Sequence, residues 1–324
     1  MENPKISVIM SVYNGAEFLR ETIESVLKQT YTNFEFIITD NASTDKTVSI
    51  IRSYNDNRIK LTVNEENKGY VANLNFMIKE AAGKYIIRQD ADDIIRKSKF
   101  EKLFEYMETH PSVGACGYYV TVFGTYKGKI RQELSNKKIR AAMLFENQMD
   151  SLSIIRASLF KDYDLIFEES LIPTEDYKFW FEVMKRSELS NIPYFLLDYR
   201  IHGTNTSIEK KEQGNKNRLE IQSQIYEYLF NQKITEETKE ILKLLYISNN
   251  CSEEVYKKII AWLEQIACFV KTGKQIDEET FLYYMARRWF IFCIHNRKLY
   301  FFKPKFIKLA QLLRFIHDQL RKKI

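Results

Sequence analysis

The chain of 324 residues lacks several features that would narrow its class at once. Its four cysteines lie far apart without C-x-x-C spacing, which argues against a zinc site or disulfide framework and favours a reducing compartment. No apolar run reaches eighteen residues, and no leader-like segment opens the chain, so neither a spanning helix nor export is expected. Neither G-x-G-x-x-G nor G-x-x-x-x-G-K-[ST] occurs, so a bound nucleotide would need another way to hold its phosphates.

What is present is the composition of a globular protein. Hydrophobic residues make up 45% and charged residues 28%, which allows a sizeable core. The net charge of +6 is unevenly placed, because residues 282–324 carry eleven Lys and Arg against one acid, Asp318. The first 281 residues therefore sum to −4, and the basic character belongs to the C-terminal segment.

The first hundred residues alternate between β-prone runs and helical patterns. Residues 6–12, 34–39, 59–63 and 85–89 are rich in β-branched and apolar side chains, the pattern of buried strands. Between them, apolar side chains recur at helical spacing, and Ser43 or Thr44 is a good N-cap for the second helix. This alternation predicts an α/β domain with a mostly parallel, doubly wound sheet flanked by helices.

Polar turns follow three of the predicted strands. They are Tyr13-Asn14, Asp40-Asn41 and Asp90-Ala91-Asp92-Asp93. Turns at the carboxyl ends of parallel strands share one edge of the sheet, where ligands usually bind. Three carboxylates within four residues repel one another unless water or a cation faces them, and Mg²⁺ accepts one or two carboxylates together with substrate phosphates. An acidic loop capping a helix over residues 94–107 is the alternative for an isolated D-x-D.

A second acidic pair, Glu175-Asp176, follows Pro173-Thr174 at the start of a predicted helix. Thr174 is a suitable N-cap, and acidic side chains in a first turn favour the helix dipole. The residues by themselves leave a structural and a catalytic role equally open.

Taken together, roughly the first 205 residues resemble the family 2 glycosyltransferases, which have the GT-A fold. The resemblance rests on seven pieces in the family's order: residues 7–14, 40–45, 67–69 with Asn75, 83–86, 90–93, 174–177 and 199–207. Two departures weaken inference about the acceptor and the nucleotide. Leu74 stands where many members have arginine, and Asp150-Ser151 stand where many have His-Pro ahead of an arginine, here Arg156.

The resemblance implies a set of site residues and ligands. Asp176, with Glu175 second, would be the catalytic base, and Asp92, Asp93 and His202 would meet a bound Mn²⁺ or Mg²⁺. The residues implied to bind the UDP-sugar are Val12, Tyr13, Asn14, Asp40, Asn41, Asn75, Asp90 and Asp92.

The chemistry of such a transfer explains these residue types. A base must take the acceptor's proton as its hydroxyl attacks the anomeric carbon, and a carboxylate of ordinary pKa is ionised at neutral pH. A metal stabilises the charge on the leaving diphosphate, and a single displacement inverts the anomeric centre. The predicted activity moves a hexose or N-acetylhexosamine from a UDP-sugar to a glycan or lipid-linked acceptor in surface polysaccharide synthesis.

Two other functions compete with this prediction. A nucleotidyltransferase would carry a Gly-rich, Arg-containing loop after the first strand, which Tyr13-Asn14-Gly15 is not. A non-catalytic sugar-nucleotide-binding or assembly subunit is the alternative, although the presence of Asp92, Asp93 and Asp176 argues against it.

The C-terminal region is predicted to be helical. After a polar connector over residues 210–217, helical patterns cover residues 219–230, 236–248, 253–272 and 278–294, which divides the chain into domains 1–207 and 208–324. The tail carries an apolar stripe with cations on its other faces, typical either of an interfacial membrane helix or of a packed or dimerising helix. Nucleic acid is not an expected partner, whereas an anionic membrane and a second copy of the chain are candidates. A cytoplasmic location, peripheral on the inner membrane face, is therefore predicted. The stripe consists of Phe306, Leu309, Leu313, Ile316 and Leu320.

Overall fold

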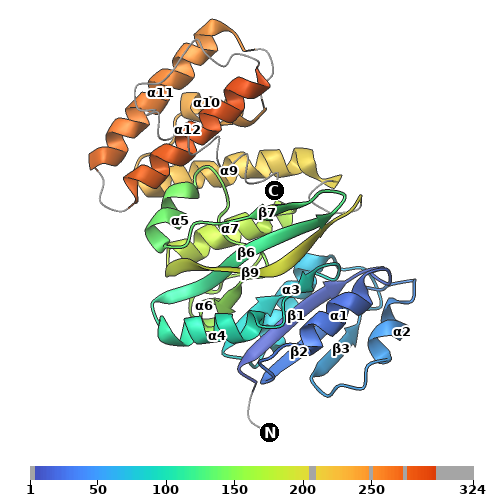
Figure 1. Ribbon diagram of the computed structural model, residues 1–324. Coiled ribbons are helices and arrows are strands. Elements are labelled where there is room, and N and C mark those ends of the chain that lie inside the picture. The colour runs from blue at the N-terminus through green and yellow to red at the C-terminus, as the bar shows by residue number, and fades with distance from the viewer. Residues whose placement is uncertain (1–3, 204–208, 248–250, 273–275, 297–324) are drawn as a thin grey trace. The chain divides into compact units, whose positions relative to one another are not determined.

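The computed structural model describes residues 4–203, 209–247, 251–272 and 276–296 (Figure 1). The chain forms two compact units. Unit 1 comprises residues 1–134 and 149–211, and unit 2 comprises residues 135–148 and 212–324.

Within the described residues, unit 1 is built on a nine-stranded mixed sheet of order β3-β2-β1-β4-β8-β6-β9-β5, with β7 paired to β6. The parallel arrangement predicted from the sequence is confirmed for β1 to β4. Beyond them β8 lies antiparallel to both β4 and β6, while β6 and β9 are parallel. The strands are β1 (Ile6–Val12), β2 (Phe34–Asp40), β3 (Ile59–Val63), β4 (Tyr85–Arg88), β5 (Ile94–Ile95), β6 (Val113–Gly124), β7 (Gly128–Ile130), β8 (Ile154–Arg156) and β9 (Glu188–Ile201).

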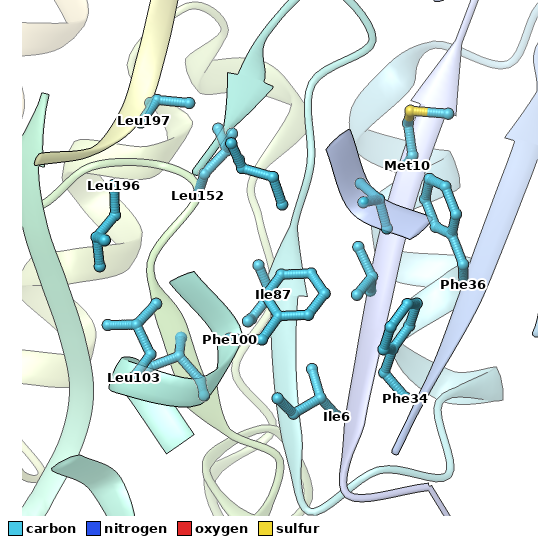
Figure 2. Close-up of a cluster of buried hydrophobic side chains, with 14 of the residues drawn as sticks. Ile6, Met10, Phe34, Phe36, Ile87, Phe100, Leu103, Leu152, Leu196 and Leu197 are labelled. Atoms are coloured by element: carbon cyan, nitrogen blue, oxygen red, sulfur yellow. The ribbon is translucent and has the colours of Figure 1, made fainter. Parts of the chain in front are cut away.

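Helices cover both faces of this sheet. On one face, α1 and α4 pack against inward side chains of β1, β2 and β4, such as Met10, Phe36 and Ile87 (Figure 2). Their neighbours along the strands, including Ile9 and Ile37, point to the opposite face because side chains alternate across a sheet. The helices of unit 1 are α1 (Leu19–Leu27), α2 (Thr47–Arg52), α3 (Tyr70–Glu80), α4 (Lys99–Thr109), α6 (Ser158–Tyr163) and α7 (Glu175–Met184), with a 3₁₀ turn at Glu169–Leu171.

Two local predictions for unit 1 were wrong. The helix over residues 94–107, which the alternative interpretation of the acidic loop assumed, begins only at Lys99, because Ile94 and Ile95 form β5 and pair with β9, a partner distant in sequence. Neither Ser43 nor Thr44 caps α2, which begins at Thr47. Instead Asp45 Oδ1 accepts the Thr47 N–H at 2.9 Å. Ser43 and Thr44 form hydrogen bonds with Asn14 in the loop after β1.

The described part of unit 2 is helical, as predicted, and α10 to α12 follow the predicted spans closely. The polar connector expected at residues 210–217 is wrong, because α9 starts at Lys211; its Lys, Glu and Gln residues are good helix formers. Residues 135–148 join this unit from within the N-terminal half, and Gln222 Nε2 donates to the Leu144 carbonyl at 2.8 Å. The helices are α5 (Asn136–Ala142), α9 (Lys211–Phe230), α10 (Glu236–Ile247), α11 (Glu253–Thr272) and α12 (Glu278–His295).

The predicted amphipathic stripe of the tail lies outside the described residues. Of the helices that the structure does describe, none combines the length and the apolar character needed to cross a bilayer.

Candidate active site

The three polar turns singled out in the sequence lie at one edge of the unit 1 sheet. Val12 pairs with Asp40 across β1 and β2, and the Asn41 N–H donates to the Val12 carbonyl at 2.8 Å. On the other side of β1, Ile9 pairs with Arg88, after which β4 ends and the acidic turn begins. Parallel strands thus bring the carboxyl ends of β1, β2 and β4 together, as predicted.

The loop after β1 is bound to the loop after β2. Asn14 N–H donates to Ser43 Oγ at 2.9 Å, and Asn14 Oδ1 accepts the Thr44 N–H at 2.8 Å. Asp45 Oδ2 accepts the Ala16 N–H at 3.1 Å. Asn14 adopts a positive φ of 48°, which turns the chain sharply at the end of the strand. These contacts join the two loops, residues 13–16 and 41–45, into one surface at this edge of the sheet, which we call the loop wall.

Asp40 lies at the base of this wall and is completely buried. Its Oδ2 accepts the Ser43 N–H at 3.0 Å, whereas its Oδ1 is buried without a hydrogen-bond partner among the described residues. A buried acceptor left unpaired costs free energy, so a donor on a ligand would be stabilised there. Its neighbour Asn41 is occupied, because its side chain binds Asn67 Oδ1 at 2.6 Å and the Lys68 N–H at 2.9 Å.

The other residues implied to bind nucleotide differ in their availability. Tyr13 is 52% exposed and leaves its ring open to a ligand, while Val12 is buried in β1 and can offer only its backbone. Asn75 is engaged elsewhere: its Nδ2 donates to the Phe167 carbonyl at 2.8 Å and its Oδ1 accepts the Phe167 N–H at 3.0 Å. A direct contact from Asn75 to nucleotide stays a prediction, and it would have to replace these bonds.

The acidic turn places each carboxylate in a different environment. Asp90 Oδ1 accepts from Arg88 Nε at 2.8 Å, and Asp92 Oδ2 lies 2.8 Å from His202 Nε2. Asp93 is fully buried; its Oδ1 accepts the Arg200 N–H at 2.8 Å, while its Oδ2 finds no partner within the described part of the chain.

The carboxylates of this turn disfavour one another's ionisation. Burial and the neighbouring Asp90 raise the pKa of Asp92, while burial together with Asp92 and Asp90 raises the pKa of Asp93 well above its usual range. A positive charge brought to the turn would relieve this repulsion and favour the ionised carboxylates.

Whether a metal fits can be judged from the donor set. Among the described residues, no group of three or more His, Cys, Asp and Glu side chains is arranged to hold a metal ion. Mg²⁺ and Mn²⁺ nevertheless need only one or two carboxylates when phosphate oxygens and water complete the shell. Among the described residues, the buried Oδ2 of Asp93 has no hydrogen-bond partner and is an oxygen of the kind that these ions accept. Of the predicted ligands, Asp92 and His202 contact each other, whereas Asp93 directs its Oδ1 to the Arg200 N–H, so the three do not form a ready-made metal-binding group in the described part of the chain.

The acidic pair that opens α7 lies near the same edge, linked to it by Arg88. Glu175 is buried and its Oε1 accepts from Arg88 Nη1 at 3.2 Å. Asp176 is partly exposed, and its Oδ1 accepts the Tyr177 N–H at 2.7 Å. Burial, with the adjacent Glu175 charge, raises the pKa of Asp176 to about 7.

Arg88 is one of the residues that the sequence prediction missed. It bridges Asp90 and Glu175, so a single guanidinium ties the acidic turn to the start of α7. Its side chain is only 11% exposed and lies over the Tyr70 ring, 5.5 Å from the centroid. A cation two residues before three clustered acids was the signal that could have identified it.

A buried polar chain behind the acidic turn was also missed. Lys99 on α4 is fully buried; its Nζ donates to Tyr118 Oη at 2.8 Å, and Tyr118 Oη donates to Asp150 Oδ1 at 2.9 Å. Burial lowers the pKa of Lys99 to about 7 and raises that of Asp150. No local pattern in the sequence marks Lys99, because its burial follows from how α4 packs on the sheet.

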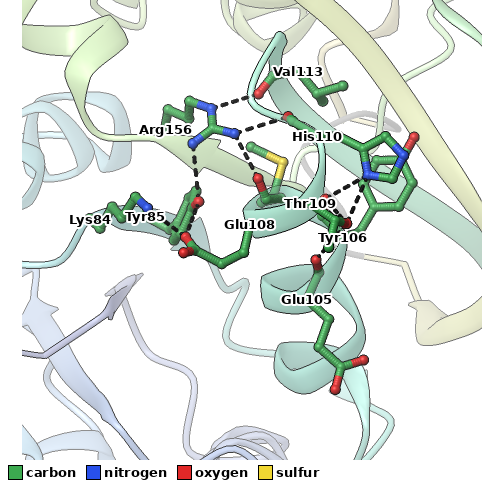
Figure 3. Close-up of polar contacts among 10 residues, drawn as sticks. Lys84, Tyr85, Glu105, Tyr106, Glu108, Thr109, His110, Val113 and Arg156 are labelled. Carbon is green, nitrogen blue, oxygen red and sulfur yellow. Dashed lines mark hydrogen bonds and ion pairs between the residues drawn. The ribbon is translucent and has the colours of Figure 1, made fainter.

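Arg156, which follows the departure at Asp150, has a structural role at the end of α4 (Figure 3). Its guanidinium donates to the carbonyls of Met107 at 2.7 Å, His110 at 3.0 Å and Val113 at 2.7 Å, and to Tyr85 Oη at 3.0 Å. These bonds satisfy carbonyls at a helix C-terminus, where cations are favoured.

Comparisons with known proteins point to one family. Residues 7–167 match the family model described as glycosyl transferase family 2. An uncharacterized glycosyltransferase of Haemophilus influenzae is 36% identical over 246 residues, which cover 71% of this chain and 76% of that protein. A protein of Escherichia coli named UDP-Glc:alpha-D-GlcNAc-diphosphoundecaprenol beta-1,3-glucosyltransferase WfgD is 30% identical over 215 residues, 65% of this chain and 82% of that protein.

Solved structures are similar in fold. The structure of S. aureus TarS 1-349 in complex with UDP-GlcNAc gives a TM-score of 0.60 at 19% identity, covering 88% of this chain and 86% of that one. Mannosyltransferase PcManGT from Pyrobaculum calidifontis, in complex with GDP-Man and Mn2+, gives a TM-score of 0.56 at 16% identity, covering 99% and 88%. These likenesses confirm the predicted GT-A type of fold.

Proposed function

Because the chain belongs to glycosyltransferase family 2, we propose that it transfers a hexose or N-acetylhexosamine from a UDP-sugar to an acceptor hydroxyl with inversion. The observation that carries the proposal is a set of three features near one edge of the sheet: Asp40 Oδ1 and Asp93 Oδ2, which have no hydrogen-bond partner among the described residues, and Asp176, whose pKa is raised. They correspond to a nucleoside contact, a diphosphate contact through a metal, and a base.

In this proposal the loop wall holds the nucleoside. Asp40 Oδ1 accepts a hydrogen bond from an N–H of the base, and the exposed ring of Tyr13 covers the base on one side. When bound through Asp93 and Asp92, Mn²⁺ or Mg²⁺ would neutralise charge on the leaving diphosphate. PcManGT in complex with GDP-Man and Mn2+ supports a metal, and TarS in complex with UDP-GlcNAc supports a uridine nucleotide.

Asp176 acts as the base. It takes the proton of the acceptor hydroxyl as that oxygen bonds to the anomeric carbon and the bond from this carbon to the diphosphate breaks. Glu175 is the weaker candidate, because Arg88 holds its Oε1 and its side chain is only 5% exposed. Arg88 also compensates part of the negative charge that Glu175 and Asp90 place beside the site.

The acceptor that we propose is a glycan, free or lipid-linked. Support comes from the name of WfgD, which acts on a diphosphoundecaprenol-linked sugar. A lipid-linked acceptor would place the protein at the inner face of the cytoplasmic membrane, with the basic C-terminal segment as its contact to anionic lipid.

The proposal is tested by the metal dependence of UDP binding. Asp93→Asn removes the carboxylate charge but keeps an oxygen for the Arg200 N–H, so binding rather than folding should suffer. Calorimetry should show UDP affinity in Mn²⁺ falling at least about tenfold, within the range for disturbed metal sites. Glu108→Gln is the matched control, because Glu108 binds Lys84 Nζ and Tyr85 Oη away from the acidic turn. Unchanged metal-dependent affinity in Asp93→Asn would remove the proposed metal role.

A screen of nucleotide sugars with Mn²⁺ then identifies the donor. UDP-glucose, UDP-N-acetylglucosamine and GDP-mannose are compared by release of the nucleotide and by transfer to glycan acceptors. Release from GDP-mannose alone would contradict the proposed uridine specificity.

A further inference from the structure

Helix α1 turns one face toward the acidic turn. Phe18, Glu21 and Thr22 share that face because residues three and four apart are neighbours on a helix. Thr22 is fully buried, and its hydroxyl lies 3.0 Å from both the Ala91 and the Asp93 carbonyl oxygens. The backbone of the turn is therefore held by a side chain of α1.

Arg200, near the end of β9, connects this helix face with the carboxylates. Its N–H donates to Asp93 Oδ1 at 2.8 Å and its Nε donates to the Asp92 carbonyl at 3.0 Å. Its Nη2 forms an ion pair with the Glu21 carboxylate of α1. One residue thus contacts the Asp93 carboxylate, the backbone of Asp92 and the helix beside the turn.

Aromatic rings fix the plane of this guanidinium. The Arg200 Cζ lies 4.5 Å from the centroid of the Phe18 ring and 4.6 Å from that of Phe123. The Phe18 ring also lies 5.1 Å from the His202 ring, and His202 contacts Asp92. The Arg200 side chain is 16% exposed, so these contacts occur largely out of water and restrict its orientation.

The oxygens to which Arg200 donates determine which oxygens of Asp92 and Asp93 stay available to a ligand. Its backbone N–H occupies Oδ1 of Asp93, which leaves Oδ2 as the oxygen without a partner among the described residues. Its Nε fixes the carbonyl of Asp92, and hence the backbone from which the Asp92 side chain leaves. Groups that orient metal-binding carboxylates in this manner typically contribute 10–100-fold to metal affinity.

We propose that Arg200, held by Glu21 of α1, is a positioning residue that orients Asp92 and Asp93 for a metal-bound nucleoside diphosphate. This inference rests on the proposed function and adds residues to its site. Glu21 is 61% exposed, and it acts on the carboxylates only through Arg200.

The test measures UDP affinity by calorimetry with and without Mn²⁺, and Mn²⁺ binding alone by electron paramagnetic resonance. Arg200→Gln keeps the backbone N–H that binds Asp93 and removes the Nε bond to the Asp92 carbonyl and the Glu21 ion pair. It should therefore weaken the metal-dependent part of UDP affinity about tenfold and leave metal-free UDP binding unchanged. Glu21→Gln should act in the same direction by about two- to fivefold, the range of an exposed ion pair. In the double variant the Glu21→Gln effect should vanish, because its route through Arg200 is gone.

Glu24→Gln is the matched control on the same helix. Glu24 forms a comparable exposed ion pair with Lys28 and should leave both affinities unchanged. Arg200→Lys keeps the charge and therefore separates the effect of charge from that of the guanidinium contacts. A thermal melt of each variant shows whether the protein remains folded.

Three results would overturn the inference. Equal losses with and without Mn²⁺ in Arg200→Gln would make Arg200 a direct phosphate ligand. Unchanged metal-dependent binding in a folded Arg200→Gln would show that the carboxylates need no such support. If the wild-type protein binds UDP equally well with and without Mn²⁺, the proposed metal role itself fails, and the role of Arg200 fails with it. The other two results would contradict the role of Arg200 alone.

Discussion

Glu175 and Asp176 are consecutive carboxylates that the fold treats differently. Glu175 is buried against Arg88, whereas Asp176 keeps part of its surface in contact with solvent. Burial and, after it, the like charge of Glu175 raise the pKa of Asp176, which brings its titration into the physiological range. At this scale the assignment of the base depends on the neighbours of each side chain, since both carry the same carboxylate group.

Asp176→Asn should retain UDP-sugar affinity and lower transfer by about two to four orders of magnitude, the usual contribution of a positioned acid–base group. The wild-type rate should also fall as pH decreases through about 7, because the raised pKa protonates Asp176 there and a protonated carboxyl accepts no proton. Calorimetry with the UDP-sugar measures the affinity, and steady-state rates at saturating donor between pH 5.5 and 8.5 measure the loss of transfer and its pH dependence. A loss of donor affinity with turnover intact would assign Asp176 to binding.

At the scale of elements, the site depends on two loops that hold each other. Asp45 accepts the Ala16 N–H through Oδ2 and the Thr47 N–H through Oδ1, so one side chain joins the loop after β1 to the start of α2. Because α2 spans only six residues, it has few hydrogen bonds of its own with which to hold this geometry.

Asp45→Ala should therefore destabilise the protein by about 1 kcal/mol, as for loss of a helix cap, and weaken UDP binding equally with and without Mn²⁺. Urea unfolding and calorimetry measure the two effects. Asp56→Ala is the matched control, because Asp56 accepts the Arg58 N–H in a similar turn that precedes β3 instead of following a strand. If both variants lose stability but neither loses UDP affinity, the loop wall does not form the nucleoside site.

At the scale of the whole molecule, the basic C-terminal segment has no role in the transfer reaction itself. Residues 282–324 hold eleven cations against one acid. In an anionic bilayer each cation near the surface contributes about 1 kcal/mol before salt screening, so several together give a salt-sensitive attachment.

The intact protein should float with vesicles containing anionic lipid at low salt and not with neutral vesicles. A variant reversing the charge of five cations should lose this binding while keeping its UDP affinity. Failure of the intact protein to bind anionic vesicles at low salt would make the segment a packing or dimerising element, which analytical ultracentrifugation would detect. The five are Lys305, Lys308, Arg314, Arg321 and Lys322.

The sequence by itself determined the parts of this protein that depend on local pattern. Near-continuous apolar runs specify β1 to β4, because strands of a parallel sheet are buried on both faces. The helical patterns between these runs specify the helices. The acidic turn was noticed because clustered carboxylates at the end of a strand need water or a cation to tolerate them. The Glu175-Asp176 pair stood equally for a helix cap and for a base until the family resemblance favoured the base. Helices α10 to α12 also follow from periodicity.

Only the tertiary structure decided which of these groups act on one another. The antiparallel β8 and the pairing of Ile94 and Ile95 with β9 depend on partners distant in sequence. Likewise, Arg88 meets Glu175 across 87 positions and Arg200 meets Asp93 across 107, and no local pattern records such a separation. Burial then sets the pKa values of Asp93, Asp176 and Lys99, because desolvation is a property of the packed chain and not of its composition.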